Sequence, residues 1–138
     1  MTNLPEPKLV IFDCDGTLVD SERLAAQLLQ QLLSEQQITL AADEVLRLFR
    51  GVPFTQFLGE LSERYPGFDT PLLAHEFRTR SLPLLRDKVT EMPGAVAFVR
   101  DARLPICVAS NGPRDKIETS LRAVGLLEVF GSRIVSAY

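Results

Sequence analysis

Two acidic side chains, two residues apart, carry the clearest chemical signal in the sequence. The segment Asp13–Thr17 has the sequence DCDGT and follows directly on an apolar run. A carboxylate can attack phosphorus to give an aspartyl-phosphate, and a carboxyl group beside it can protonate the leaving alcohol and later deprotonate water. Gly16 allows backbone N–H groups to approach an anion. The pattern therefore indicates phosphoryl transfer, although acidic residues after a strand can also be ordinary solvated carboxylates.

A phosphate group beside two carboxylates also predicts a metal cofactor. Repulsion between these anions has to be offset by a hard cation, and oxygen ligands favour magnesium (Mg²⁺). We therefore expect Mg²⁺ beside these two carboxylates.

Three short apolar runs are expected to form the strands that position these residues. Lys8–Phe12 and Pro105–Ala109 have the composition of buried parallel strands, and Arg133–Ser136 predicts a third. Helices are expected over residues 95–102 and from Pro113 to Val124. Alternating strands and helices predict an α/β fold with a parallel sheet and right-handed crossovers. Ligands bind at the carboxyl ends of such strands, so one crevice can collect Asp13, Asp15 and the turn Ser110–Gly112.

A helical insert separates the first strand from the second. Apolar residues recur at helical spacing from Asp20 onward, and the stretch from 20 to 90 contains no convincing strand. We expect helices from Asp20, around Asp43–Phe49, around Thr55–Tyr65 and from Thr70 onward, with Pro83 kinking or ending the last one. The predicted domains are an α/β core of residues 1–19 and 91–138 and a helical domain of residues 20–90.

Composition limits the classes of partner. With 46% apolar and 24% charged residues, the 138-residue chain is typical of a soluble globular protein. Its net charge of −3 does not indicate the basic surface that binds nucleic acid. Apolar stretches are too short to span a bilayer, and Met1–Pro7 does not have the pattern of a leader. Cys14 and Cys107 lie in runs expected inside the core, where small reduced cysteines fit. We expect a cytoplasmic protein that binds a small phosphorylated metabolite, not nucleic acid or membrane.

Two motifs in this order resemble the haloacid dehalogenase superfamily. Its first motif, D-x-D-G-T, is matched by Asp13–Thr17, and its second, a hydrophobic strand ending in Ser or Thr, by Val108–Ser110. The resemblance implies a Rossmann-like core with an inserted α-helical cap. It also implies that Asp13 is the nucleophile and Asp15 the general acid/base, with magnesium bound by the Asp13 side chain and the Asp15 backbone carbonyl.

The same resemblance implies a set of phosphate- and substrate-binding residues. The Ser110 hydroxyl and the N–H groups that follow it would hold phosphoryl oxygens, and the full set is Gly16, Thr17, Ser110, Asn111, Gly112, Glu22 and Arg50. Two alternatives stay open from the residues alone. The Ser110 turn could only cap the next helix, and Arg50 could be a solvated surface arginine.

Three segments are similar to bacterial sugar-phosphate phosphatases of the 6-phosphogluconate type. They are Phe12–Glu22, Arg50–Val52 and Val108–Pro113 with Lys116. This subgroup is close to β-phosphoglucomutase. This similarity implies hydrolysis of a sugar phosphate or a phosphorylated sugar acid such as 6-phosphogluconate. The alternatives are a sugar phosphomutase and a catalytically inactive, truncated phosphatase that only binds phosphate. A receiver-type signalling domain is less consistent with the helical insert.

Lys116 itself is expected on a solvated helix face, with an electrostatic role in the site as the alternative.

The superfamily's later motifs, a lysine after the third strand and an acidic pair after the fourth, have no matching positions before Tyr138. We therefore expect little or no turnover by these 138 residues alone. We also expect an unpaired sheet edge at Leu9–Phe12 through which the chain can self-associate.

Overall fold

The computed structural model describes residues 4–138 and divides the chain into two compact units. An α/β unit is formed by the residues up to Asp20 together with Val89–Tyr138, and a helical unit is formed by Ser21–Lys88. These bounds lie within two residues of the expected domain limits at 20 and 90. The first three residues of the expected segment 1–19 lie outside the described part. No helix in residues 4–138 is both long and apolar enough to cross a membrane.

The α/β unit contains the predicted parallel sheet. Its strands are β1 (Val10–Phe12), β2 (Ile106–Ser110) and β3 (Ile134–Ser136), in the order β1-β2-β3. Both pairings are parallel, with Phe12 opposite Val108 and Ser110 opposite Ser136. The α/β fold class is therefore confirmed, and the carboxyl ends of all three strands meet at one edge of the sheet.

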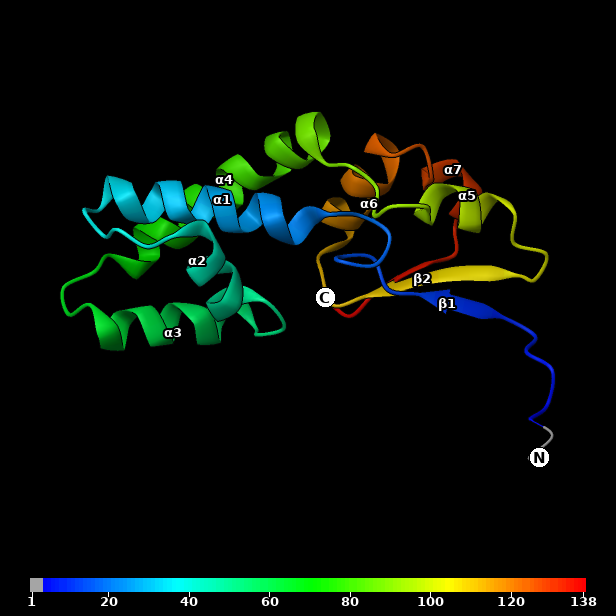
Figure 1. Cartoon of the computed structure of the whole chain (residues 1–138), viewed down its shortest axis with the longest axis horizontal. Coiled ribbons are helices and arrows are strands. Elements are labelled where there is room, and N and C mark those ends of the chain that lie inside the picture. The colour runs from blue at the N-terminus through cyan, green and yellow to red at the C-terminus, as the bar shows by residue number, and fades with distance from the viewer. Residues whose placement is uncertain (1–3) are drawn as a thin grey trace. The chain divides into compact units, whose positions relative to one another are not determined.

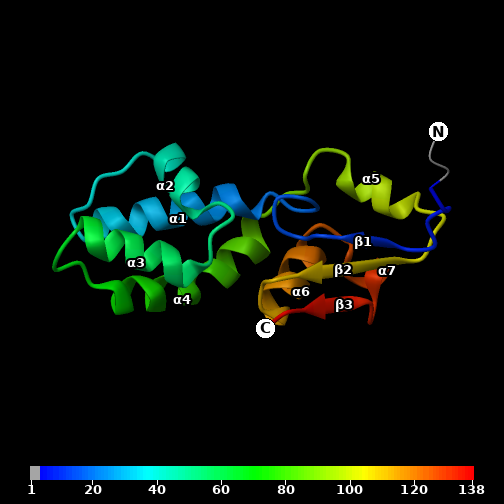
Figure 2. The ribbon, with the colours of Figure 1, turned by 90° about the horizontal axis from the view of Figure 1, so that it is seen from below.

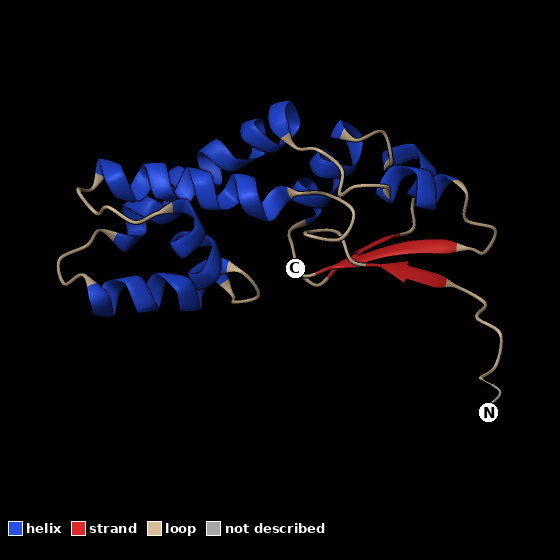
Figure 3. Cartoon of the chain, in the orientation of Figure 1, coloured by secondary structure: helices blue, strands red, loops and turns tan. Residues whose placement is uncertain are grey.

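Helices cover one face of this sheet. These are α5 (Ala95–Arg100), α6 (Arg114–Ala123) and α7 (Leu127–Phe130), of which α7 is too short for the sequence pattern to predict (Figures 1 and 3). Side chains alternate between the two faces of a strand, so Ile106, Val108 and Ile134 point to the covered face and are buried. This face supplies the apolar core of the unit.

The opposite face corrects the expectation of fully buried strands. Ile11 is 62% exposed and Val135 is 56% exposed, and Cys107 is only half-buried. Register places Ile11 beside Cys107, and Ala109 beside Val135. Seen from below in Figure 2, these strands form the near surface of the unit. A continuous apolar run cannot show by itself whether one or two faces of its strand are covered.

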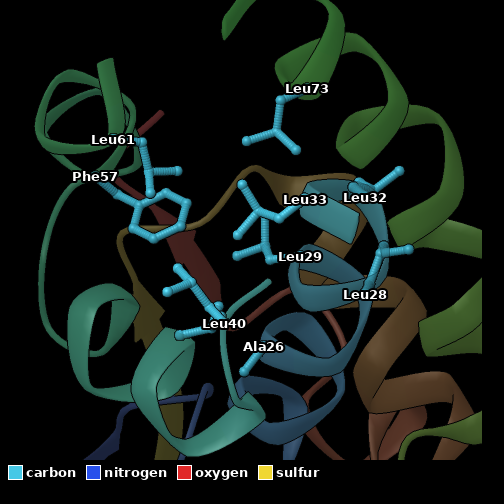
Figure 4. Packing of buried hydrophobic residues seen from close by; sticks show 10 residues of the cluster. Ala26, Leu28, Leu29, Leu32, Leu33, Leu40, Phe57, Leu61 and Leu73 are labelled. Atoms are coloured by element: carbon cyan, nitrogen blue, oxygen red, sulfur yellow. The ribbon is translucent and has the colours of Figure 1, made fainter. Parts of the chain in front are cut away.

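The helical unit packs four helices around one apolar core. They are α1 (Ser21–Glu35), α2 (Ala42–Phe49), α3 (Phe54–Arg64) and α4 (Thr70–Lys88), and α1 contacts both α2 and α4. Apolar residues at helical spacing on α1 face the other three helices, as Figure 4 shows. The buried cluster comprises Ala26, Leu28, Leu29, Leu32, Leu33, Leu40, Val45, Phe57, Leu61 and Leu73.

Pro83 does not end the last helix of this unit. Helix α4 runs from Thr70 to Lys88 with Pro83 inside it. Proline has no N–H to donate to the carbonyl four residues earlier, which is why the sequence predicts an interruption. Helix α4 packs against α1 and α3, and these contacts compensate for the missing hydrogen bond, so the helix continues.

Candidate active site

A tight loop places the two aspartates just beyond β1. Gly16 has a φ of 72°, in the left-handed region that glycine adopts without strain. The carbonyl of Cys14 accepts hydrogen bonds from the backbone N–H groups of Thr17, Leu18 and Val19, at 3.2, 2.9 and 3.2 Å. The loop therefore turns within a few residues and keeps Asp13, Gly16 and Thr17 exposed to solvent.

The far end of this loop is anchored in the α/β unit. Leu18 and Val19 are buried, and Val19 forms an antiparallel bridge with Glu91. The N–H of Asp20 donates to the carbonyl of Thr90 at 2.9 Å. Because both ends are fixed, the loop holds the aspartates on a rigid base rather than on a mobile segment.

The second motif lies at the end of the neighbouring strand. Ser110 is the last residue of β2 and is only 8% exposed. Its Oγ accepts a hydrogen bond from the N–H of Gly112 at 3.1 Å, and its carbonyl accepts one from the N–H of Ala137 at 3.0 Å. The Ser136 hydroxyl donates to the carbonyl of Gly112 at 2.6 Å. The end of β3 therefore holds the turn in place.

Lys116 reaches this turn from the first part of α6. Its Nζ donates a hydrogen bond to Oδ2 of Asp15 at 3.1 Å, and its side chain is 31% exposed. The expectation of a solvated helix face is therefore wrong for Lys116. Helical periodicity gives the face on which a residue lies, but it does not show that a long side chain extends to a strand end 101 residues away in sequence.

Three polar side chains surround the position of Gly112. A Cβ added there would lie 3.4 Å from Ser110 Oγ, 3.7 Å from Asp15 Oδ2 and 3.8 Å from Lys116 Cδ. The structure thus brings Asp15, Ser110, Gly112 and Lys116 into one cluster, with Asp13 on the same loop as Asp15. Asn111 is exposed next to the cluster.

Cys14 lies between the two aspartates but faces the core. It is 1% exposed, and its N–H donates to Oδ1 of Asp13 at 2.8 Å. Burial raises the pKa of its thiol from 9.0 to about 12; the charges of Asp15 and Asp13 add to the rise, and Lys116 opposes it. Cys14 is therefore a packing residue, as the alternation of side chains predicts.

Glu22 and Arg50 belong to the helical unit. Glu22 is in the first turn of α1, and Arg50 follows the last residue of α2. Arg50 Nε donates to Glu22 Oε2 at 2.9 Å, with 61% of the arginine side chain and 25% of the glutamate side chain exposed. The two predicted substrate-binding residues thus contact each other, and the guanidinium stays accessible from solvent.

Two carboxylates at the sheet edge fit the way in which magnesium binds to proteins. Among residues 4–138, no group of three or more His, Cys, Asp or Glu side chains is placed to hold a metal. Magnesium, however, usually takes one or two carboxylates and completes its shell with water and substrate phosphate oxygens. Asp13 and Asp15 supply oxygen donors of this kind, so the residues present suit that ion.

Comparisons with known proteins give related sequences and structures. The chain is 32% identical over 130 residues to 6-phosphogluconate phosphatase of Escherichia coli, covering 94% of this chain and 59% of that protein. A haloacid dehalogenase-like protein from Agrobacterium tumefaciens superposes with a TM-score of 0.85 at 29% identity, covering 96% of this chain and 60% of the other. A HAD family hydrolase from Deinococcus radiodurans, with bound phosphate and sodium, gives a TM-score of 0.75 at 31% identity, covering 94% and 57%.

The family itself follows from a match over nearly the whole sequence. The model of the haloacid dehalogenase-like hydrolases matches residues 7–138. The chain spans less than two thirds of the length of the relative and of each of the two solved structures described above. Within that span, the match includes both motifs at the carboxyl edge of the sheet. The chain belongs to the haloacid dehalogenase-like hydrolase family.

Proposed function

We propose that the carboxyl edge of this sheet is the site at which small phosphate monoesters are hydrolysed through an aspartyl-phosphate on Asp13. One observation carries the proposal: Asp15, Ser110 and Lys116 converge around Gly112, beside the loop that presents Asp13 to solvent. A carboxylate nucleophile, a second carboxyl group, a hydroxyl and an ammonium are the groups that phosphoryl transfer from an alcohol needs.

The chemistry requires two displacements at phosphorus. The Asp13 carboxylate attacks, its oxygen bonds to phosphorus, and the bond between phosphorus and the alcohol oxygen breaks. Asp15 gives its proton to the departing alkoxide. Asp15 then takes a proton from water, whose oxygen displaces Asp13, so inorganic phosphate leaves and the carboxylate is restored. Magnesium, held by the Asp13 side chain and the Asp15 backbone carbonyl, would supply positive charge for the phosphoryl oxygens.

Ser110 and the turn after it bind the transferring group in this proposal. The N–H of Gly112 donates to Ser110 Oγ, so the hydroxyl proton of Ser110 remains available for a phosphoryl oxygen. The start of α6 lies directly after this turn, and the N-terminus of a helix favours an anion. Gly16, Thr17 and Asn111, which are exposed nearby, complete the set of residues that contact phosphate.

The proposed substrate class is a sugar phosphate or a phosphorylated sugar acid such as 6-phosphogluconate. The 32% identity to 6-phosphogluconate phosphatase supports this class. The exposed guanidinium of Arg50, which Glu22 orients, suits a substrate carboxylate or phosphate. A cytoplasmic location belongs to the same proposal, and the free thiols of Cys14 and Cys107 support it.

The test is to trap the covalent intermediate. Trapping requires only the first displacement and not turnover, of which little is expected from these 138 residues alone. The 138-residue chain is therefore incubated with magnesium and a reactive phosphate monoester such as p-nitrophenyl phosphate, and the acyl phosphate is then reduced with borohydride. Peptide mass spectrometry should find the reduced residue at position 13. Asp13→Asn should abolish the signal because an amide does not attack phosphorus as a carboxylate does. Asp101→Asn, an exposed aspartate of the same unit, is the matched control and should keep it.

Two results would contradict the proposal. Labelling that survives in Asp13→Asn would remove Asp13 as the nucleophile, and no labelling in the wild-type chain would remove the covalent route at this site. Transfer of the phosphoryl group to a sugar phosphate, giving a bisphosphate rather than free phosphate, would assign the mutase reaction instead.

A further inference from the structure

Lys116 occupies a position that is unfavourable for the helix that carries it. It is the third residue of α6 (Arg114–Ala123), in the first turn. The N-terminal end of a helix carries partial positive charge, so a cation there is disfavoured and an anion is favoured. An anion close to the helix start reduces this cost, and Asp115 in the same turn, whose Oδ1 accepts a hydrogen bond from the Lys116 N–H at 2.8 Å, is one such anion.

Asp15 supplies part of that compensation. Its carboxylate accepts a hydrogen bond from Lys116 Nζ at 3.1 Å, between side chains that are 31% and 26% exposed. Partial exposure leaves the pair within reach of a ligand from solvent. The lysine stem passes beside the Gly112 turn, because a Cβ on Gly112 would lie 3.8 Å from Lys116 Cδ and 3.4 Å from Ser110 Oγ. Lys116 and the Ser110 hydroxyl, which the proposed function assigns to phosphate, thus both lie beside Gly112.

We propose that Lys116 binds the phosphoryl group of the substrate and is the side chain that balances its charge at this site. An ammonium has three N–H donors, so a bond to Asp15 leaves donors for phosphate oxygens. The charge of Lys116 adds to the partial positive charge of the α6 N-terminus, so both attract the same anion. The inference rests on the proposed function, since it takes the same edge of the sheet as the phosphate site.

A purely structural role is the competing explanation. In that case Lys116 only tethers Asp15, and any donor that reaches Asp15 would serve. The two roles differ in their need for positive charge: a tether needs one hydrogen bond, whereas phosphate binding needs the charge as well. Lys116→Gln keeps an N–H donor without the charge, Lys116→Arg keeps the charge, and Lys116→Met removes both.

The experiment measures binding of inorganic phosphate to the 138-residue chain by isothermal titration calorimetry, at fixed magnesium concentration and ionic strength. Lys116→Gln and Lys116→Met should both weaken binding about tenfold or more, the size expected for losing a hydrogen bond between charged groups. Lys116→Arg should stay close to wild type. Lys8→Met, at an exposed lysine that precedes β1 in the same unit, is the control for general loss of charge and should bind normally. Circular dichroism verifies the fold of each variant.

The results separate this inference from the proposed function. Wild-type affinity in Lys116→Gln would overturn the role in phosphate binding and leave Asp13 labelling untouched. Equal weakening by Lys8→Met and Lys116→Met would also overturn it, because the effect would then be general electrostatics. A wild-type chain that binds no phosphate removes the inference, while aspartyl-phosphate at Asp13 would still support hydrolysis. Lys116-dependent binding without labelling of Asp13 would support the inference and contradict the function.

Discussion

Because Gly112 has no side chain, space remains between the polar groups of the candidate site. Among the described residues its φ is not in the left-handed region, so the backbone does not require glycine there. A Cβ would lie 3.4 Å from Ser110 Oγ and 3.7 Å from Asp15 Oδ2, which are ordinary van der Waals contacts. A methyl group therefore fits, but it fills the space between the groups assigned to phosphate. The glycine keeps that space open.

Gly112→Ala should consequently weaken phosphate binding while the protein remains folded. We expect the free energy of unfolding to change by less than about 1 kcal/mol, because the substitution creates neither a clash nor a cavity. Phosphate affinity, measured by calorimetry, should fall several-fold. Gly59→Ala is the control, since Gly59 lies in α3 with nothing within 4 Å of its added Cβ, and phosphate affinity should not change. Normal binding by Gly112→Ala would show that phosphate does not use this space.

The two thiols should differ in reactivity because only one is buried. Cys14 is 1% exposed with a pKa raised to about 12, whereas Cys107 is half-buried on the open sheet face. A thiol has to be ionised and accessible to react with an alkylating reagent. At pH 8 iodoacetamide should therefore modify Cys107 much faster than Cys14, as read by peptide mass spectrometry. Both should react alike in denaturant, and comparable native rates would contradict the burial of Cys14.

The raised pKa of Cys14 also fixes the sign of a pH effect on stability. The unfolded chain, with a thiol pKa near 9.0, loses its proton before the folded chain, whose pKa is about 12. The contribution of this thiol to stability is therefore complete below about pH 9 and is lost as pH rises toward 12. Denaturant unfolding should show the wild type losing stability relative to Cys14→Ala between pH 8 and pH 10. A constant difference would indicate that folding does not raise the pKa of this thiol.

Residue types and spacing suffice to find the groups that directly follow predicted strands. Asp13, Asp15 and Ser110 all follow or end apolar runs, so the sequence alone predicts that they share one edge of the sheet. The sequence alone does not predict that Ser136 and Lys116 contact the groups at this edge. Ser136 ends β3 at the same edge, but its hydrogen bond to Gly112 depends on backbone positions that only the folded sheet fixes.

Among the elements, α4 is the clearest case of packing prevailing over local preference. Pro83 removes one backbone donor in the middle of the helix, yet the helix continues to Lys88. Leu73 and Leu85 are buried on either side of the proline along the helix, so both halves are held by apolar contacts. Sequence rules for helix ends include the lost hydrogen bond but not these contacts, which explains why the helix does not end at Pro83; the other predicted effect of Pro83, a kink, stays a prediction.

Replacing this proline should stabilise the helical unit. Pro83→Ala restores an N–H donor and removes the ring, and an interior proline costs up to about 3 kcal/mol relative to alanine. Proline also restricts the unfolded chain, which offsets part of the gain. We expect the free energy of unfolding in urea to rise by about 1–2 kcal/mol, monitored by circular dichroism.

Pro71 provides the matched control because it is the second residue of the same helix. In the first turn the missing N–H has no partner within the helix, and the fixed φ of proline suits that position. Pro71→Ala should therefore leave the unfolding free energy unchanged or slightly lower. Equal stabilisation by the two substitutions would show that the gain does not depend on the interior position of Pro83 in α4.

On the scale of the whole chain, the sheet of the α/β unit has one covered face and one open face. Ile11 and Val135 lie on the open face with Cys107 and Ala109, and β1 pairs with β2 alone among the described strands. Exposed apolar side chains beside an unpaired edge favour association with another strand. A second copy can pair through β1 about a two-fold axis, which repeats the same contacts in both copies.

We therefore expect the 138-residue chain to self-associate as its concentration rises, measured by sedimentation velocity. Ile11→Glu should weaken the association about tenfold or more, because the contact would bury an unpaired carboxylate. Leu72→Glu is the control: Leu72 is an exposed apolar residue of α4, in the helical unit, and its replacement should not alter association. If both variants act alike, general solubility and not the sheet determines the behaviour; if the wild type stays monomeric at all concentrations, the open face and the β1 edge do not drive association.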